Sequence, residues 1–370
     1  MEQITISDST QLVDPKLRAI VKHVMLKLEL AIEKVAANHQ DPTKYPLAAD
    51  PTSFEQIIAA RFRILSEEKK QIAMIKIMRR IKASKEKRVA HYGDLSEVDL
   101  TKAESIESQA KAILFPQHLK FSADHLKGLT KVHGDVLLPT STILGGEAKS
   151  NGEAKISNLA ATAPTDNLEF RIHTVVCRDR TSDGIAGLEA SDEMRLGGAS
   201  ADENGDTKTV KDFSVQTFTS DGQQKNYSPP LRFTYFNLNE GTAFPKTYWV
   251  TPVLAEQDKG DFWEYLYNLT KSVEKEITAA LAAAVGIAIG SSGGPVGAII
   301  GAVVGAAVGA AFTLFKNIVG DEIFGGPALS CSIPSLTARW SGNTYSPQHV
   351  VTYNGYGGQY QMTYSWNMYA

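Results

Sequence analysis

The chain has 370 residues with a formal net charge of -3, and 21% of its residues are charged. This near-balanced charge, with a pI of about 6.3, argues against a nucleic-acid partner, because it provides no basic surface on the scale of the whole protein. The two cysteines, Cys177 and Cys331, are too few for a disulfide framework, so we expect two buried thiols. The length is enough for two or three domains.

The first residues, MEQITISDSTQLVDP, are polar and acidic. A secretory signal begins with basic residues and continues with an apolar core, and this stretch has neither. We therefore expect a protein that is made in the cytoplasm without a signal peptide. It would either stay there or leave by a route that needs no cleaved leader.

Residues 1–135 are predicted to form a helical domain with the character of a bundle. Asp14-Pro15 is a good helix start, because proline suits the first helical position, and apolar residues recur after it at helical spacing. A second, longer helix is expected to open at Asp50-Pro51 and to carry apolar residues from Phe54 to Ile75.

Residues 136–167 are rich in Gly, Ala, Ser and Thr, which predicts a linker. From residue 168 the apolar period becomes two, as in LEFRIHTVV and TYWVTPVL, and this alternation continues to about residue 265. It returns in residues 326–370, where HVVTYNG and GQYQMTYSWNMY predict a hairpin. Either set of strands alone would leave exposed edges. We therefore predict an α+β protein in which residues 266–325 are inserted into one antiparallel β-sandwich.

The insertion contains a long apolar segment. Residues 277–315 include no Asp, Glu, Lys, Arg or His, although the mean hydropathy of the whole chain is only -0.18. The Gly293-Gly294-Pro295 break predicts two helical arms, 277–289 and 296–315, that form a hairpin. The second arm would be about 30 Å long, which is near the hydrocarbon thickness of a bilayer.

Glycines recur at four-residue spacing along this hairpin, and such a stripe lets another helix backbone approach closely. In water each helical glycine costs roughly 0.8–1 kcal/mol relative to alanine, so we expect close helix contact to compensate. The stripe leaves three interpretations open: the buried centre of a soluble bundle, a permanent transmembrane anchor, and a segment that is sheltered first and inserted later. The residues expected to carry helix packing and membrane insertion are Gly286, Gly290, Gly293, Gly297, Gly301, Gly305 and Gly309.

A basic stretch runs from Lys69 to Arg88, where Glu86 is the single acidic residue. On a helix it could bind anionic lipid headgroups, or it could be an ordinary solvated face. Base stacking is disfavoured because the stretch contains no aromatic residue. The residues expected to contact headgroups are Lys76, Arg79, Arg80 and Lys82.

Acidic residues cluster in the turns of the β-region, and calcium prefers six to eight oxygen ligands of this kind. Solvated turn acids are the alternative interpretation. The calcium ligands considered are Asp179, Asp183, Asp192, Glu193, Asp202 and Asp206. We expect no other cofactor. Gly290-x-Ser292-x-Gly294 formally matches a hydrolase nucleophile turn, which needs a strand before it, a helix after it, and acid and histidine partners downstream. Here the match lies in an Ala/Gly-rich segment and the only later histidine is His349, so we expect no enzyme.

The segment FPKTYWVTPVLAEQDKGDFWEYL leads into the glycine stripe, and YNGYGGQYQMTYSW closes the chain. This arrangement resembles bacterial membrane-inserting toxins that shield a glycine-zipper hairpin, and it is similar to secreted or injected bacterial proteins such as contractile-injection-system cargo. The resemblance implies export by a leaderless route and action at a target membrane. It carries no site residues over to this chain.

Three functional hypotheses follow. The first is a non-enzymatic, membrane-active effector or pore-forming toxin whose hairpin inserts and associates, with a lipid membrane and copies of itself as partners. The second is a structural or assembly protein of a bacterial secretion or injection complex that uses the hairpin for tight helix packing. The third is a calcium-dependent adhesion or binding module.

Overall fold

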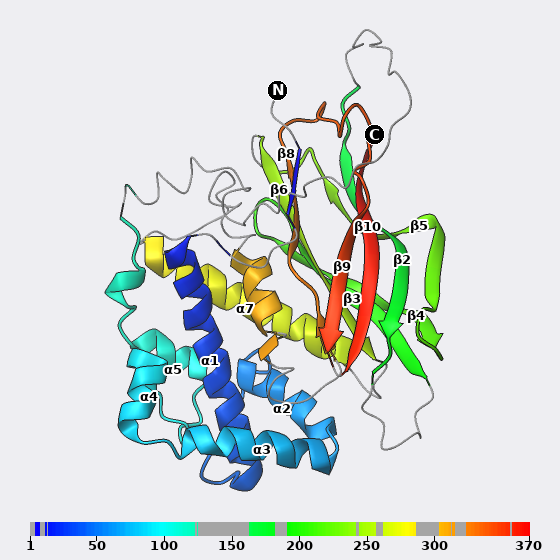
Figure 1. Cartoon of the computed structure of the whole chain (residues 1–370). Helices are drawn as coiled ribbons and strands as arrows, with labels where there is room; N and C mark the ends of the chain where they lie inside the picture. Colours follow the sequence, from blue (N-terminus) through cyan, green and yellow to red (C-terminus); the bar gives the residue numbers. More distant parts are fainter. Residues whose placement is uncertain are drawn as a thin grey trace.

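The computed structural model describes residues 4–7, 12, 14–122, 124, 163–181, 191–241, 244–256, 262–285, 303–311, 313–314, 323–355 and 357–370. Helices gather on one side of the molecule and two antiparallel β-sheets on the other (Figure 1). The α+β class, with an N-terminal helical region and antiparallel sheets, is confirmed.

The N-terminal helices begin at clear capping residues. Asp14 accepts hydrogen bonds from the backbone N–H groups of Lys16 and Leu17, both at 2.9 Å, so the predicted first helix starts where expected. The helical elements of this region are α1 (Pro15–Gln40), α2 (Phe54–Ile64), α3 (Glu67–Ile81), α4 (Lys85–Tyr92), η1 (Gly93–Glu97), α5 (Ile106–Ala112) and η2 (Gln117–Leu119).

The single long helix predicted after Asp50-Pro51 is wrong, because the chain forms α2 and α3 as separate helices. Asp50 instead makes a turn in which its side chain accepts from the Thr52 backbone N–H at 2.8 Å. Ser66 caps α3 by accepting from the Lys69 N–H at 3.2 Å. A serine followed by two glutamates is a strong helix start, and here it outweighs the continuous apolar pattern.

Sheet A has the strand order β1-β8-β6-β3-β4, with β7 also pairing to β6, and sheet B has the order β5-β2-β10-β9. β1 was not predicted, because three residues are too short to show a period. The strands of sheet A are β1 (Thr5–Ser7), β3 (Asp192–Ala201), β4 (Thr207–Phe218), β6 (Lys246–Glu256), β7 (Ile323–Gly325) and β8 (Leu329–Ile333). The strands of sheet B are β2 (Asn167–Asp179), β5 (Gln224–Asn237), β9 (His349–Gly355) and β10 (Gly358–Tyr369).

β6 shows how the layers are stacked. Its side chains alternate between two cores, so Tyr248, Val250 and Leu254 pack between the two sheets, whereas Trp249 and Val253 pack against the helices. Both faces of the strand are therefore buried, and the molecule has three layers: helices, sheet A and sheet B.

The chain leaves sheet A after β6 and later returns to the same strand. α7 (Phe262–Val285) and the helical residues 303–311 lie between β6 and β7 in sequence. β7 then pairs with β6, with Val253 opposite Gly325. Gly197 of β3 helps to seat α7 on the sheet: a Cβ at that position would lie 2.5 Å from the Trp263 ring, so only glycine leaves room for this side chain.

Candidate functional site

The apolar segment that the sequence singled out is partly buried in the residues that the structure describes: Ala279 and Thr313 are exposed, whereas most of residues 303–311 are not. Residues 303–311 are helical, and all of them except Ala310 are buried. Val303, Ala307 and Ala311 have no exposed surface and belong to the core formed by α1, α2, α7 and the helix-facing side of sheet A. Within the described ranges, no helix combines the length and the apolar character needed to cross a bilayer.

At Gly305 the glycine stripe packs beside sheet A. A Cβ at Gly305 would lie 3.6 Å from the Ala328 Cβ and 3.7 Å from the Trp249 Cβ, so at this position the helix packs against sheet A and its margin. The described neighbours of Gly305 thus belong to sheet A and its margin, and contact of the stripe with another helix stays a prediction. Gly309 is buried too, and its carbonyl accepts from the Thr313 hydroxyl at 3.0 Å. Gly286, Gly290, Gly293, Gly297 and Gly301 lie outside the described residues.

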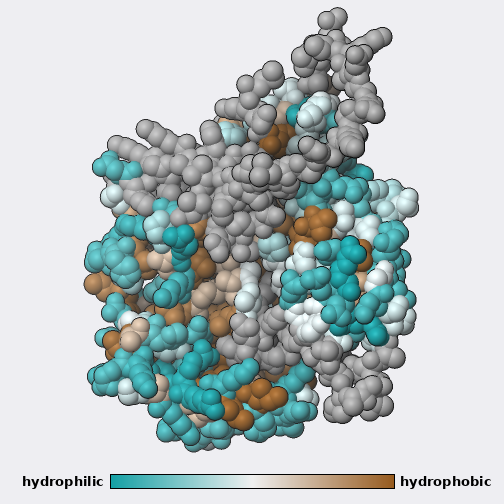
Figure 2. Space-filling view, in the orientation of Figure 1, coloured by the Kyte–Doolittle hydropathy of each residue, from teal (hydrophilic) through white to brown (hydrophobic). Residues whose placement is uncertain are grey.

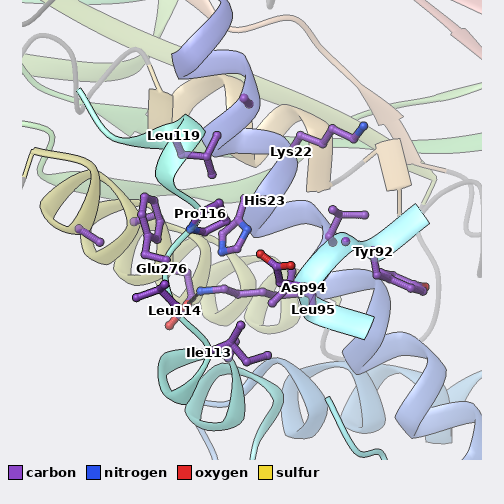
Figure 3. A pocket seen from close by; sticks show the side chains of 18 of the residues that line it. Lys22, His23, Tyr92, Asp94, Leu95, Ile113, Leu114, Pro116, Leu119 and Glu276 are labelled. Atoms are coloured by element: carbon purple, nitrogen blue, oxygen red, sulfur yellow. Dashed lines mark hydrogen bonds and ion pairs between the residues drawn. The ribbon is translucent and has the colours of Figure 1, made fainter. Parts of the chain in front are cut away.

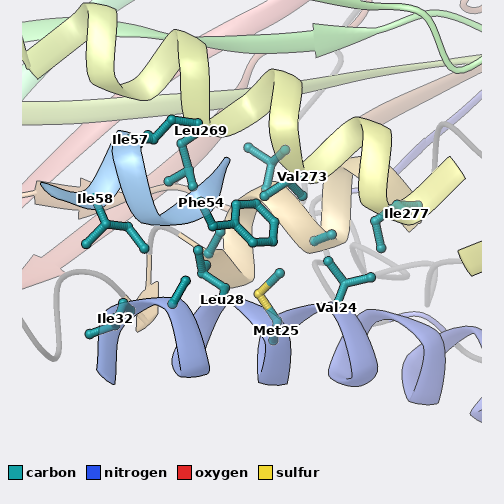
Figure 4. Packing of buried hydrophobic residues seen from close by; sticks show 14 of the residues in the cluster. Val24, Met25, Leu28, Ile32, Phe54, Ile57, Ile58, Leu269, Val273 and Ile277 are labelled. Atoms are coloured by element: carbon teal, nitrogen blue, oxygen red, sulfur yellow. The ribbon is translucent and has the colours of Figure 1, made fainter. Parts of the chain in front are cut away.

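Helices α1 and α2 lie over α7, the helix that leads into the glycine-rich segment, and we call these two helices the cover. Figure 4 shows their apolar side chains meeting in one layer between the three helices. All of these side chains are at most 9% exposed, so removing the cover would expose a continuous apolar surface. The residues of the layer are Val24, Met25, Leu28 and Ile32 of α1, Phe54, Ile57 and Ile58 of α2, and Leu269, Val273 and Ile277 of α7.

Polar contacts fasten the cover to α7. The Lys27 ammonium of α1 lies 2.9 Å from a Glu276 carboxylate oxygen of α7, and the two side chains are only 7% and 4% exposed. The Ser272 hydroxyl donates to the Thr52 carbonyl at 2.7 Å, and the Phe121 N–H donates to the Ala284 carbonyl at 2.8 Å. A buried ion pair of this kind is costly to break from one side, because the remaining charge stays buried.

A cavity of about 650 Å³ opens beside the Lys27–Glu276 pair (Figure 3). α1, η1, the stretch from α5 to η2, and α7 enclose it. His23 projects into it from α1, with its ring edge-on to Phe115 at a centroid distance of 5.7 Å.

Burial lowers the pKa of His23 to about 4, and the Lys27 charge and His118 act in the same direction against the carboxylates of Glu276 and Asp94. The folded protein therefore prefers the neutral imidazole. Between pH 6.5 and about pH 4 the imidazole of His23 is protonated in the unfolded chain but stays neutral in the folded chain. Proton binding therefore favours the unfolded state, and stability falls as the pH falls through this window.

Replacing His23 with glutamine should remove this part of the pH dependence. We expect the wild type to lose about 1–2 kcal/mol more stability than His23→Gln between pH 6.5 and pH 4, after allowance for partial solvent exposure. Urea unfolding at half-unit pH steps measures the difference. His39→Gln is the control, since that exposed ring lies at the C-terminal end of α1, outside the cavity. Parallel pH profiles for wild type and His23→Gln would contradict the assignment.

The expected headgroup-binding residues divide into two groups. Lys76, Arg79 and Lys82 have exposed side chains on α3. Arg80 lies 3.1 Å from Glu29 and 3.8 Å from Glu33 with 31% of its side chain exposed, so its charge is paired within the helical region and its contact with headgroups stays a prediction. The physical reason is that α3 packs on α1, whose buried Glu33 needs a cation.

The acidic turns do not converge on one ion. Asp192 and Asp202 flank opposite ends of the ten-residue strand β3, about 30 Å apart. Asp192 is buried and accepts from the Thr181 backbone N–H at 2.9 Å and from the Tyr360 hydroxyl. Asp202 accepts from the Asn204 and Asp206 N–H groups.

These carboxylates thus serve turns and strand ends, which contradicts a shared calcium site for the set. Glu193 follows Asp192 in β3, Asp179 is the last residue of β2, and Asp183 lies outside the described residues. In the described ranges, no group of three or more histidine, cysteine or carboxylate side chains could hold a metal ion. Cys177 and Cys331 are buried free thiols, as expected.

Sequence reasoning missed the Lys27–Glu276 pair, although a signal for it was present. Lys27 follows Val24 by three residues on the apolar face of α1, and Glu276 directly precedes the buried Ile277. A charge on a core-facing stripe indicates a buried partner. The two residues are 249 positions apart, so the sequence alone could not pair them.

Comparison with known proteins gives no relative for this chain: no family model, no curated protein and no solved structure matches it.

Proposed function

We propose that this protein is a non-enzymatic, membrane-active effector that shelters an apolar helical segment in its resting fold and inserts that segment into a target membrane. One observation carries the proposal. Residues 303–311 of an uncharged, glycine-rich stretch are mostly buried against sheet A and the helices, and α7, the helix that leads into this stretch, is fastened by a small number of polar contacts. A segment held in this way can be released without unfolding the sandwich.

The outer face of α3 supports an encounter with a membrane. Ile72 and Ile75 are 49% and 58% exposed, and the exposed Arg79 and Lys82 continue the same helical face at spacings of four and three. Such a pairing of apolar and basic side chains suits the boundary between headgroups and acyl chains. Figure 2 shows brown patches among teal ones along the lower edge of the helical region, where Figure 1 places α2 and α3.

Export by a leaderless route such as a contractile injection system, and association of several copies in the membrane, belong to the same proposal. They are supported by the sequence resemblance described above and by the glycine spacing, which favours helix pairing in lipid.

Gly305→Ala is the sharpest test, because it separates the resting fold from the inserted state. The added methyl group would make ordinary contacts at 3.6–3.7 Å in the resting fold, so the melting temperature should stay the same or rise. In a membrane the same group would obstruct close helix approach. We expect dye leakage from anionic vesicles to fall several-fold.

Ala310→Ser is the matched control, since Ala310 is on the same helical segment but off the glycine stripe. It should leak like the wild type. A wild-type protein that releases no dye from anionic or neutral vesicles at pH 7 or pH 5 would end the proposal.

A structural or assembly role is the second candidate, and the packing of Gly305 against Trp249 and Ala328 favours it, because this part of the segment already has a place inside the folded chain. Size measurement in detergent-free buffer and vesicle flotation separate the two functions. A stable large oligomer that never floats with lipid would support assembly, whereas a monomer that floats would support the effector.

A further inference from the structure

The cavity beside the Lys27–Glu276 pair has the size of a small-molecule site. Its volume of about 650 Å³ lies within the usual range for such sites, and close-packed protein interiors rarely leave a space this large. One face of α7 creates the space, because Glu276, Ala279, Ala280 and Ala283 recur there at helical spacing with three small side chains. The cavity thus exists because one face of α7 carries small side chains, and not because a single side chain is poorly packed.

The opposite wall is apolar and partly uncovered. Ile113, Leu114 and Phe115, which follow α5, line the cavity together with Leu26 of α1. Leu114 is 74% exposed, more than any other large apolar side chain in the described ranges. An apolar ligand body lying along this wall would remove that surface from water, which is the usual source of affinity in such a site.

The charges around the cavity favour an anion. The charges of Lys27 and Glu276 cancel each other. The other charged residues that line the cavity are Lys22, Lys111 and Asp94, which sum to a positive charge, and three histidines also line it. Neither ring nitrogen of His23 has a hydrogen-bond partner among the described residues, and Figure 3 shows its ring inside the cavity. It can therefore donate to an oxygen ligand there.

We propose that this cavity binds a small amphiphilic anion, with a carboxylate head beside His23 and Lys22 and an apolar chain along Leu26, Leu114 and the alanine face of α7. The site is independent of the proposed membrane activity. Because the ligand would touch both α1 and α7, its binding would stabilise the arrangement in which the helical cover is closed.

Decanoate, below its micelle-forming concentration, is the test ligand for the full-length chain. Isothermal titration calorimetry should give one saturable site, and the melting temperature should rise with ligand concentration. Acetate supplies the head without the chain, and decyltrimethylammonium supplies the chain with the opposite charge. Both should bind at least ten-fold more weakly than decanoate.

Two variants locate the site. Ala283→Leu fills the cavity from α7 with a good helix former and should abolish binding, and Lys22→Gln should weaken it about five-fold. Lys87→Gln, on the exposed face of α4, is the control and should bind like the wild type.

Equal binding of the cationic amphiphile, or unchanged binding by a folded Ala283→Leu, would overturn the proposal. Vesicles that contain anionic lipid without free decanoate form a further arm. If these vesicles compete with decanoate for the cavity, the cavity binds the headgroup of a membrane lipid. The proposal of a free carboxylate ligand would then be wrong. Neither result depends on whether the protein makes vesicles leak.

Discussion

Replacing Lys34 with methionine should lower the free energy of unfolding by about 3–5 kcal/mol, one of the two largest effects that we expect from a single substitution. Lys34 of α1 and Glu55 of α2 are both fully buried, and their Nζ and Oε1 atoms are 3.0 Å apart. The Lys34 ammonium also donates to the Glu104 carbonyl at 2.8 Å. Methionine fills a similar volume but leaves the Glu55 carboxylate buried without its cation.

The Glu55 carboxylate is also the point at which three parts of the helical region meet. It accepts from the backbone N–H of Ala48 and from that of Ile106, each at 2.8 Å. Loss of the lysine should therefore loosen α1, α2 and α5 together. Urea unfolding followed by circular dichroism measures the change, and Lys87→Met on the exposed face of α4 is the control. A Lys34→Met protein within about 1 kcal/mol of the wild type would show that the pair is not structurally important.

Lys27→Met should cost about 3 kcal/mol, because it leaves the Glu276 carboxylate buried without the ammonium that lies 2.9 Å away. The double variant Lys27→Met with Glu276→Leu removes both charges and should return to within about 1 kcal/mol of the wild type, since apolar residues of similar volume can replace a buried ion pair. Urea unfolding of Lys27→Met, of Glu276→Leu and of the double variant gives the coupling between the two residues.

The same set of variants also tests whether the pair fastens the cover to α7. The single variant should be cleaved faster by protease in the helical region and should release vesicle dye at lower protein concentration. The double variant should behave like the wild type in both assays. If the single and double variants leak equally, the ion pair has no part in release, whatever its effect on stability.

Local sequence signals predicted the elements that follow a regular period. Asp14-Pro15 marked the start of α1, and the alternation in TYWVTPVL marked β6 as a strand, although it did not indicate that both faces of the strand are buried. They failed where two local signals competed, as at Ser66, where a capping serine divided a continuous apolar pattern into two helices.

The site was less predictable, because it depends on contacts between distant parts of the chain. The spacing of the glycines indicated a close neighbour, but not that the neighbour of Gly305 would be Trp249 of sheet A. Turn acids such as Asp192 and Asp202 looked like one cluster in sequence, and the length of β3 separates them. The cavity depends on small residues of α7 that face η1 and the stretch after α5, and no period reveals such a coincidence.

The strand order has a consequence for the synthesis of the chain. β10, which begins at Gly358, lies in the interior of sheet B, between β2 and β9. The sandwich therefore cannot close while the ribosome is still making residues before Gly358. The apolar segment leaves the ribosome during this interval, when the surface that will bury it is half built. A newly made chain must thus keep its most apolar stretch from other molecules before the complete fold can do so, and helices α1 to α5, which are already translated, can cover it during this interval.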